Sequence, residues 1–544
     1  MIKTEAERIQ YPVLLWMIAI LILVVSFYRL GTWGVIDTSE ARYAEIGRQM
    51  YESGDYLHPV YLGIEHYHKP PMTYWITAAG YHLFGVNPFA ARFFLQCALL
   101  LQLLLSYRIT GLIYTSSRVS FYATMIYASF MIVWVSVRNL TTDAYLNTFL
   151  LLSTWSLFAY LFRQKVRYLY LFALFFAMAF LTKITAVFVF MGSLFLFIFW
   201  KYRSRIRWSW HMLGAGMLAL MISGSWFLLL QMEGKSVLEY MLYEQSVVRY
   251  TSDTFRRSMP FYFYFVAGPL LTFPWFFLVL IQMIKRRNLS EKKHDLLLLG
   301  FCLLLPLFFF SISHSKLLLY VLPAFWALAV VGGKMLDQMS DEAIRVWIRL
   351  QSIWIILLFS TLLILPIIDS QYILGTTILL LIGISLCLFL YIYLNKILSP
   401  PFKLVTLSVG LTLSLIMMSS HFLTNNEEDS STGKIAAEWI VNHDLGTRQV
   451  FIYDKLAPSF AFHLKKDIAL IGDREKRELQ FEQSDQWKKY YYDLEDSVQK
   501  EALLSALREN AVLICRSKRV AEIDPNILRA FTNKYQTGLW TIFY

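Results

Sequence analysis

Long apolar runs recur along almost the whole of this chain of 544 residues, and they limit its possible folds more than any other feature. A helix of about 17 to 25 apolar residues crosses the roughly 30 Å hydrocarbon core of a bilayer. The composition agrees, because 57% of the residues are hydrophobic and only 16% are charged. The sequence therefore predicts an α-helical polytopic membrane protein with about thirteen transmembrane helices. The predicted spans are 11–30, 89–113, 119–136, 143–162, 167–182, 184–200, 209–231, 260–284, 295–313, 316–333, 345–368, 371–395 and 404–423.

Lysine and arginine concentrate in alternate loops between these runs, which predicts an orientation. Short cytoplasmic loops carry an excess of both residue types. We therefore expect a bacterial inner-membrane protein whose N-terminus is cytoplasmic. The basic loops are 163–167, 201–207, 285–293, 334–345 and 396–403. The stretches predicted outside are the loop 31–88, the loop 232–259, the turn 311–316 and everything after about residue 424.

The first apolar run is expected to be an uncleaved membrane anchor. A cleavable signal peptide has a basic flank and a small-x-small cleavage site. Here Lys3 and Arg8 are balanced by Glu5 and Glu7, and no such site follows. The net charge is +12, and most of the basic residues lie in the predicted cytoplasmic loops. The topology of the chain and contact with anionic lipid account for basic residues there. Nucleic-acid binding is therefore not expected.

The composition changes to that of a soluble domain after about residue 424. Helical patterns alternate there with short apolar runs that are typical of strands. The sequence predicts a transmembrane domain over 1–423, which includes the outer loop 31–88, and a soluble extracytoplasmic α/β domain over 424–544. The expected helices are "STGKIAAEWIVNHD" and "EALLSALREN", and the expected strands are "QVFIYD", "DIALIG", "AVLICR" and "WTIFY".

Charged residues cluster in four places at the predicted outer boundary of the membrane, where ionisable groups are costly and tend to mark function. Each has a structural alternative. Asp37 and Glu40 resemble a capping box, Asp143 suits the dipole of a helix that begins there, and the cations suit lipid headgroups. The candidates are Asp37, Glu40, Arg42 and Tyr43; Lys69 in "YHKPPMTYW"; Asp143; and Arg256, Arg257, His314, Lys316 and Tyr320.

The joint occurrence of these groups on one face favours a functional site. Cations from distant parts of the chain suit a phosphate group, and carboxylates suit a hydroxyl or amino group. A membrane enzyme that acts on a lipid-linked phosphate needs both. His314 has no second histidine or carboxylate at ligand spacing, so we interpret it as a polar boundary residue that contacts substrate and not as a metal ligand.

The stretches "SEARYAEIGRQMYESGDY" and "GIEHYHKPPMTYWITAAGYHLFGVNPFAARF" resemble the first outer loop of the bacterial ArnT/PMT-like glycosyltransferases, which are GT-C integral-membrane enzymes. Later stretches resemble the same family in the same order: "TTDAYLNTFLLL", "LTKITAVFVF", "GSWFLLL", "FYFYFVAGPLLTFPW" and "SKLLLYVLPAFWALA". The resemblance implies a GT-C fold. It also implies transfer of a sugar from a polyprenyl (undecaprenyl) phosphate carrier to an envelope acceptor such as lipid A, a glycan or a protein.

The resemblance also implies roles for individual residues. Asp37, Glu40 and Asp143 are the candidate catalytic carboxylates. In the lipid A aminoarabinose transferases an aspartate directly precedes the glutamate of the motif, and here that position is Ser39. The choice of carboxylate and the identity of the sugar therefore stay open. The implied donor-phosphate ligands are Lys69, Arg256, Arg257 and Lys316, and the implied substrate contacts are Arg42, Tyr43, Tyr320 and His314.

A polyprenyl phosphate leaves as a stable anion, so it needs cations and no general acid. A hydroxyl acceptor needs a carboxylate to take its proton, whereas a phosphate acceptor does not. We expect single displacement with inversion at the anomeric carbon. The carboxylates also allow a divalent cation, Mg²⁺ or Mn²⁺. The alternatives are a lipid or sugar transporter that uses the same charged cavity, and a membrane-anchored sensor whose outer domain binds a partner.

Overall fold

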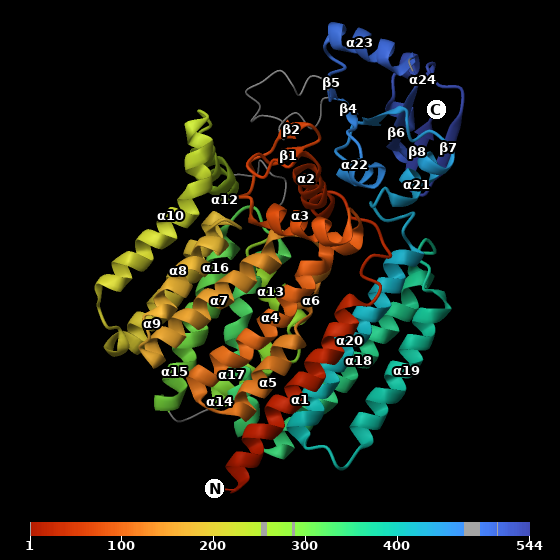
Figure 1. Cartoon of the computed structure of the whole chain (residues 1–544). Helices are drawn as coiled ribbons and strands as arrows, with labels where there is room; N and C mark the ends of the chain where they lie inside the picture. The colour runs from red at the N-terminus through yellow and green to blue at the C-terminus, as the bar shows by residue number, and fades with distance from the viewer. Residues whose placement is uncertain (1, 252–257, 286–288, 473–489, 509) are drawn as a thin grey trace.

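The computed structural model describes every residue except 1, 252–257, 286–288, 473–489 and 509. The described helices form one bundle, with the N-terminus at one end and the C-terminal sheet beyond the other (Figure 1). The bundle consists of α1 (Ile2–Phe27), α4 (Pro88–Tyr114), α5 (Ser117–Ala128), α6 (Met131–Arg138), α7 (Thr142–Arg163), α8 (Arg167–Phe180), α9 (Ile184–Tyr202), α10 (Trp210–Met232), α13 (Phe263–Leu271), α14 (Trp275–Lys285), α15 (Leu289–Leu299), the π-helix η3 (Gly300–Leu304), α16 (Leu305–Ile312), the 3-10 helix η4 (Leu318–Ala324), α17 (Phe325–Gln338), α18 (Asp341–Ile368), α19 (Gly375–Leu394) and α20 (Pro400–Asn425).

The prediction of a polytopic helical membrane protein is confirmed. Among the described residues, nine helices are long and apolar enough to cross a bilayer, or eleven if each of two bent pairs is one span. The predicted runs 11–30 and 167–182 correspond to the shorter apolar helices Val13–Phe27 and Arg167–Phe180. The total of thirteen spans therefore stays a prediction.

Two of the predicted spans are broken helices. The α5 and α6 helices meet at 58°, and α13 and α14 meet at 101°. Pro274 lies directly before α14, and a proline has no backbone N–H to continue a helical ladder. Periodicity alone does not reveal such breaks, because both halves stay apolar.

The segments predicted outside gather at one end of the bundle, around α2, α3 and the C-terminal sheet (Figure 1). The first outer loop folds as α2 (Ser39–Ser53), a small hairpin of β1 (Val60–Tyr61) and β2 (Ile64–Glu65), and α3 (Met72–Phe84). The second contains α11 (Val237–Leu242), the π-helix η2 (Tyr243–Val248) and α12 (Arg249–Thr251). The expected concentration of these loops on one face is thus present in the structure.

The C-terminal unit is a six-stranded mixed sheet with the strand order β5-β4-β3-β6-β8-β7. The first four strands in this order are parallel, whereas β8 is antiparallel to both β6 and β7. Every strand and helix predicted from the sequence is present. The elements are α21 (Lys434–Asn442), β3 (Gln449–Tyr453), α22 (Pro458–Leu464), β4 (Ala469–Ile471), β5 (Tyr491–Tyr492), α23 (Ser497–Arg508), β6 (Ala511–Arg516), the 3-10 helix η7 (Ser517–Glu522), α24 (Pro525–Leu528), β7 (Lys534–Thr537) and β8 (Trp540–Phe543).

The sheet joins the first outer loop through a shared apolar core. Alternate strand residues face opposite sides, and one side, which includes Val450, packs in a single cluster with Ile46 of α2 and Tyr74 of α3. The other side, which includes Phe451, packs against α23. The C-terminal unit is therefore docked on the motif-bearing loop and does not stand apart from it.

Candidate active site

A cavity opens at the outer end of the bundle, between the first and second outer loops. The space inside it, with its open mouth included, is about 660 Å³. Five separate segments line it. The lining residues are His68, Lys69 and Pro70; Lys183, Ile184, Thr185 and Ala186; Met241, Gln245, Ser246 and Tyr250; Phe309, Phe310, Ser313 and Ser315; and Tyr320.

An ion pair between α7 and α9 lies at this cavity. Asp143 lies in the first turn of α7 and is 6% exposed. Its Oδ1 accepts a hydrogen bond of 2.8 Å from Lys183 Nζ, which also lies 4.0 Å from the centre of the Tyr320 ring. Because Lys183 precedes the N-terminus of α9, its charge adds to the positive end of that helix dipole. The cavity wall is therefore suited to an anion.

Lys69 reaches the cavity from the segment that precedes α3. Pro70 and Pro71 follow it, and prolines suit the start of a helix because the first N–H groups have no partner there. Lys69 Nζ donates a hydrogen bond of 2.8 Å to the carbonyl of His68. The N–H of Met72 donates to Leu181 O at 3.1 Å, so the start of α3 is tied to the turn that carries Lys183.

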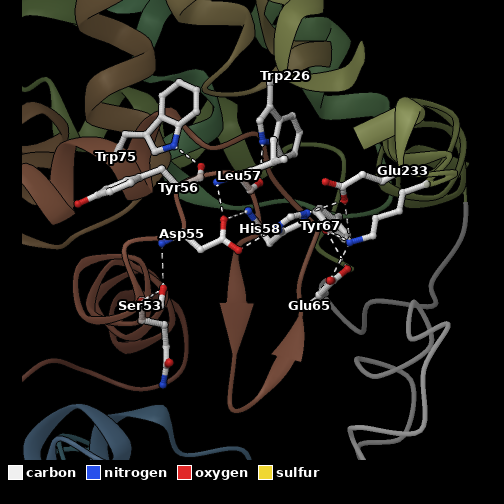
Figure 2. Close-up of polar contacts among 12 residues, drawn as sticks. Ser53, Asp55, Tyr56, Leu57, His58, Glu65, Tyr67, Trp75, Trp226 and Glu233 are labelled. Carbon is white, nitrogen blue, oxygen red and sulfur yellow. Dashed lines mark hydrogen bonds and ion pairs between the residues drawn. The ribbon is translucent and has the colours of Figure 1, made fainter. Parts of the chain in front are cut away.

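A polar network ties the first outer loop to the end of α10 (Figure 2). His58 Nδ1 lies 2.8 Å from Asp55 Oδ2, and its Nε2 lies 2.7 Å from Glu233 Oε2. Burial lowers the pKa of His58, but the hydrogen bonds to Asp55 and Glu233 outweigh it and raise the pKa above its ordinary value. The imidazolium form is thus favoured, and it bridges two carboxylates.

Three further hydrogen bonds complete this network, and Figure 2 shows Leu57, Glu65, Tyr67 and Trp226 near the β1–β2 hairpin. Lys235 Nζ donates to Glu65 Oε1 at 2.7 Å, and Tyr67 OH donates to Glu65 Oε2 at 2.8 Å. The indole N–H of Trp226 donates to Leu57 O at 2.9 Å. These contacts hold the strand that leads to Lys69 against the second outer loop.

Glu40 is fully engaged inside the protein. Its Oε1 accepts from Arg92 Nε at 2.7 Å and from Leu140 N at 3.1 Å, and its Oε2 accepts from Arg92 Nη2 at 2.8 Å and from Ile36 N at 2.9 Å. Glu40 and Arg92 are 1% and 0% exposed. A carboxylate has about four acceptor positions, so none remains for a substrate. Glu40 therefore has a positioning role. It accepts from the N–H of Leu140, and the helix that begins two residues later carries Asp143.

Asp37 contacts the C-terminal unit and does not line the cavity. Its Oδ2 accepts from Ser459 Oγ at 2.8 Å, and its Oδ1 accepts from Ser459 N at 3.1 Å. Part of the residue is exposed, yet protein groups surround the carboxylate. This burial, only partly offset by the charge of Lys455, raises the pKa of Asp37 to about 6 from an ordinary value of 3.8. Asp37 therefore fastens the docked sheet to the motif.

We expect docking of the C-terminal unit to weaken as the pH rises through about 6. A carboxyl group with a raised pKa stabilises the docked state below its ordinary pKa of 3.8, and this contribution is lost as the group ionises. Asp37→Asn imitates the protonated form and should remove this pH dependence. Thermal unfolding of the C-terminal unit between pH 4.5 and 7.5 measures it. The exposed Glu438 of α21 provides the control Glu438→Gln, which should behave as wild type; equal pH dependence in Asp37→Asn would contradict the assignment.

The other predicted residues are divided between the cavity and its surroundings. Tyr320 lines the cavity, whereas Arg42 lies over the Tyr61 ring and Tyr43 stacks on Tyr74. Lys316 donates to the backbone carbonyls of Met259, at 2.9 Å, and Ser313. It is 5% exposed, and burial lowers its pKa. It therefore holds two outer segments together beside the cavity.

His314 is an exposed residue whose N–H donates to Tyr250 O at 3.0 Å. Arg256 and Arg257 lie outside the described residues. In the part of the chain that the structure describes, no three His, Cys, Asp or Glu side chains lie close enough together to hold a metal ion.

Lys183 was missed in the sequence interpretation, although the stretch "LTKITAVFVF" contributed to the resemblance. Its turn is only three residues long, between α8 and α9, and is easily taken for part of two adjacent apolar runs. The signal that identifies it is a single lysine between two long apolar stretches, because a charge at membrane depth needs a partner. That partner is Asp143.

Comparison with known proteins agrees with this geometry. A family model described as dolichyl-phosphate-mannose-protein mannosyltransferase matches residues 68–227, a stretch that contains Lys69, Asp143 and Lys183. The crystal structure of ArnT from Cupriavidus metallidurans bound to undecaprenyl phosphate superposes with a TM-score of 0.79 over 98% of both chains, at 18% identity. The chain therefore has the fold of ArnT, and it resembles the ArnT and mannosyltransferase proteins in sequence. The resemblance inferred from the motifs is confirmed.

Sequence comparison also relates this chain to ArnT proteins. The chain is 28% identical over 377 residues to the undecaprenyl phosphate-α-4-amino-4-deoxy-L-arabinose arabinosyl transferase of Aeromonas salmonicida. The aligned residues cover 66% of this chain and 67% of the relative. The chain is 30% identical over 302 residues to the Aeromonas hydrophila protein of the same name, which covers 54% of each. The fold extends further than the sequence likeness, because it spans both domains.

Proposed function

We propose that this protein transfers a sugar from a polyprenyl phosphate carrier to an envelope acceptor, on the outer face of a bacterial inner membrane. The observation that carries the proposal is a cavity at the end of an ArnT-like bundle, lined by Lys69 and by Lys183, which is paired with Asp143. Cations there suit the carrier phosphate, and the carboxylate suits an acceptor hydroxyl. The acceptor class comprises lipid A, a glycan or a protein.

The proposed reaction is a single displacement. The acceptor oxygen forms a bond to the anomeric carbon while the bond from that carbon to the phosphate oxygen breaks, and the electron pair leaves with the phosphate. Lys69 stabilises the charge that develops on the phosphate. Asp143 takes the acceptor proton, and Lys183 holds the Asp143 carboxylate in place through its hydrogen bond. The product should have the inverted anomeric configuration, which NMR measures; retention would contradict the mechanism.

The proposed orientation places the N-terminus in the cytoplasm and the C-terminal unit outside. The described basic loops 163–167, 201–207, 334–345 and 396–403 lie away from α2, α3 and the C-terminal sheet (Figure 1). This arrangement supports the proposed orientation, because short cytoplasmic loops carry an excess of lysine and arginine. Cysteine labelling from each side of sealed vesicles tests it. A single cysteine introduced at Lys500, in the C-terminal unit, should react only from the outside.

The function is tested with a panel of synthetic polyprenyl phosphate sugars, extracted envelope acceptors and the purified full-length protein. We expect transfer from at least one donor, and a KM for that donor about 10- to 100-fold higher in Lys69→Met, because a charged hydrogen bond contributes roughly 1.5–3 kcal/mol. Lys500→Met, at a surface ion pair with Asp524, is the matched control. Failure of the wild type with every donor would overturn the function and favour a transporter.

A further inference from the structure

Exposed cations gather where the turn between α7 and α8 meets the segment between α9 and α10. The two segments are held together, because Gln164 Nε2 donates to Arg205 O at 2.9 Å and Tyr160 OH donates to Arg207 O at 2.7 Å. Both lie away from α2, α3 and the C-terminal sheet (Figure 1). We call this cluster the basic patch, and its cations are Arg163, Lys165, Arg167, Lys201, Arg203, Arg205 and Arg207.

Carboxylates are missing from this part of the sequence, since no Asp or Glu occurs between Asp143 and Glu233. In the part of the chain that the structure describes, no carboxylate pairs with a cation of the basic patch. Arg118 of α5, by contrast, pairs with Asp337 of α17. Membrane orientation does not explain the absence, because it depends on lysine and arginine and Asp and Glu contribute little to it.

Two arginines of the basic patch converge on one hydroxyl group. Arg163 Nη1 and Arg167 Nη2 donate to Tyr168 OH at 2.7 and 3.3 Å, and their guanidinium carbons lie 5.6 and 5.0 Å from the centre of the Tyr168 ring. Each guanidinium has five N–H donors, so most of them stay available. Two like charges held close together repel each other, and a bound anion offsets this repulsion. Phosphate fits, because its oxygens accept two parallel hydrogen bonds from a guanidinium group.

Exposed tryptophans place the basic patch at the surface of the membrane. Trp208 and Trp210 are 86% and 87% exposed, and Trp200 at the end of α9 is 66% exposed. Tryptophan is enriched at the level of the lipid headgroups, and the apolar helices α9 and α10 continue from there into the hydrocarbon. The cations beside these rings therefore lie among headgroup phosphates. A dissolved anion would give the three tryptophans no role.

We propose that the basic patch is a binding site for an anionic phospholipid. Arg163 and Arg167 bind the headgroup phosphate, and the other five cations of the patch strengthen the attraction. The three exposed tryptophans pack beside the glycerol and the first methylene groups of the acyl chains. A zwitterionic lipid binds less well, because its ammonium group brings a further positive charge to the patch. This site is separate from the cavity and does not depend on the proposed function.

The experiment uses the full-length protein in vesicles made of equal parts of phosphatidylcholine and phosphatidylglycerol. A trace of either lipid, with a photoactivatable group beside its headgroup, is crosslinked to the protein, and mass spectrometry identifies the labelled peptides. Peptides that cover 160–172 and 200–212 should be labelled at least about 10-fold more by the phosphatidylglycerol probe, because each basic residue near an anionic surface contributes roughly fivefold. Equal labelling by the two probes would overturn the proposal.

The triple variant Arg163→Gln, Arg167→Gln and Arg203→Gln should lose most of this preference, because the three charges together correspond to a factor of roughly 100. All three side chains are exposed. The preference of the wild type should also fall as the salt concentration rises, since ions screen exposed charges. An unchanged preference in the triple variant, or a wild-type preference that does not depend on salt, would contradict the proposal.

The matched control is the triple variant Arg345→Gln, Arg349→Gln and Lys396→Gln, which removes as many exposed cations from α18 and from the segment after α19. It should keep the wild-type preference at the same peptides, and an equal loss would assign the preference to net charge and overturn the site. Glycerol phosphate has the headgroup phosphate without acyl chains and should not compete with the probe. Competition by glycerol phosphate would assign the basic patch to a soluble anion and overturn the lipid as its ligand.

Discussion

Asp143→Asn is expected to lower kcat for transfer to a hydroxyl acceptor by about 10²- to 10⁴-fold, the usual contribution of a general base. The amide keeps the shape of the side chain, and its oxygen still accepts from Lys183, as Asp143 Oδ1 does at 2.8 Å. Only the negative charge and the ability to take a proton are lost. The KM for the donor should therefore change little, and the dependence of kcat on a deprotonated group should disappear from the pH profile.

Asp369→Asn is the matched control for this variant. Asp369 follows α18 and its Oδ1 accepts from Gln371 N at 3.1 Å, a bond that asparagine retains. Neither Asp369 nor its partner Gln371 lines the cavity, whereas Lys183, the partner of Asp143, does. The activity of Asp369→Asn should therefore equal that of wild type. A kcat that is unchanged in Asp143→Asn would remove Asp143 from proton transfer, and would indicate an acceptor that is already ionised, such as a phosphate.

Arg92→Met should destabilise the protein by about 3–5 kcal/mol, the range for removing one partner of a buried ion pair. The Glu40 carboxylate, which is 1% exposed, would be left without its charged partner. Arg92 also donates to the carbonyls of Leu30, Trp33 and Gly34, at 3.0, 3.1 and 2.8 Å. The substitution therefore releases the start of the first outer loop as well as α4. The midpoint of thermal unfolding in detergent measures the loss.

The ion pair of Arg118 with Asp337 offers the comparison, because its side chains are 38% and 26% exposed. Arg118→Met should cost less than about 1 kcal/mol, as exposed pairs do. The double variant Glu40→Gln with Arg92→Met should recover part of the loss, since the uncompensated charge is gone. A loss in Arg92→Met as small as in Arg118→Met would show that the Glu40–Arg92 pair does not hold the motif.

Much of the fold could be predicted from the sequence, because membrane helices and buried strands both appear as apolar runs of characteristic length. The apolar runs all correspond to helices or bent pairs, and the strands of the C-terminal unit lie where the short apolar runs predicted them. The breaks in 119–136 and 260–284 were not predicted. A break changes the direction of a helix without changing its polarity, so hydropathy carries no signal for it.

Only part of the candidate site could be predicted from the sequence. Lys69, Asp143 and Tyr320 were predicted as site residues. In the structure Lys69 and Tyr320 line one cavity, and Asp143 pairs with Lys183, which also lines it. The three carboxylates Asp37, Glu40 and Asp143 were equivalent in sequence, because each is an acidic residue at the outer boundary. Their roles differ through their partners, which lie 40 to 422 positions away in the chain.

The sequence by itself determined the membrane class, the one-sided distribution of charged loops and the likeness to ArnT/PMT-like enzymes. These properties depend on composition, on the spacing of apolar residues and on short motifs, all of which are local features of the chain. Only the tertiary structure decided which carboxylate lies beside the cavity. Arg92 occupies the acceptor positions of Glu40, Ser459 holds Asp37, and Lys183 pairs with Asp143 beside the cavity. Such partnerships are set by long-range packing, which no local pattern of residues encodes.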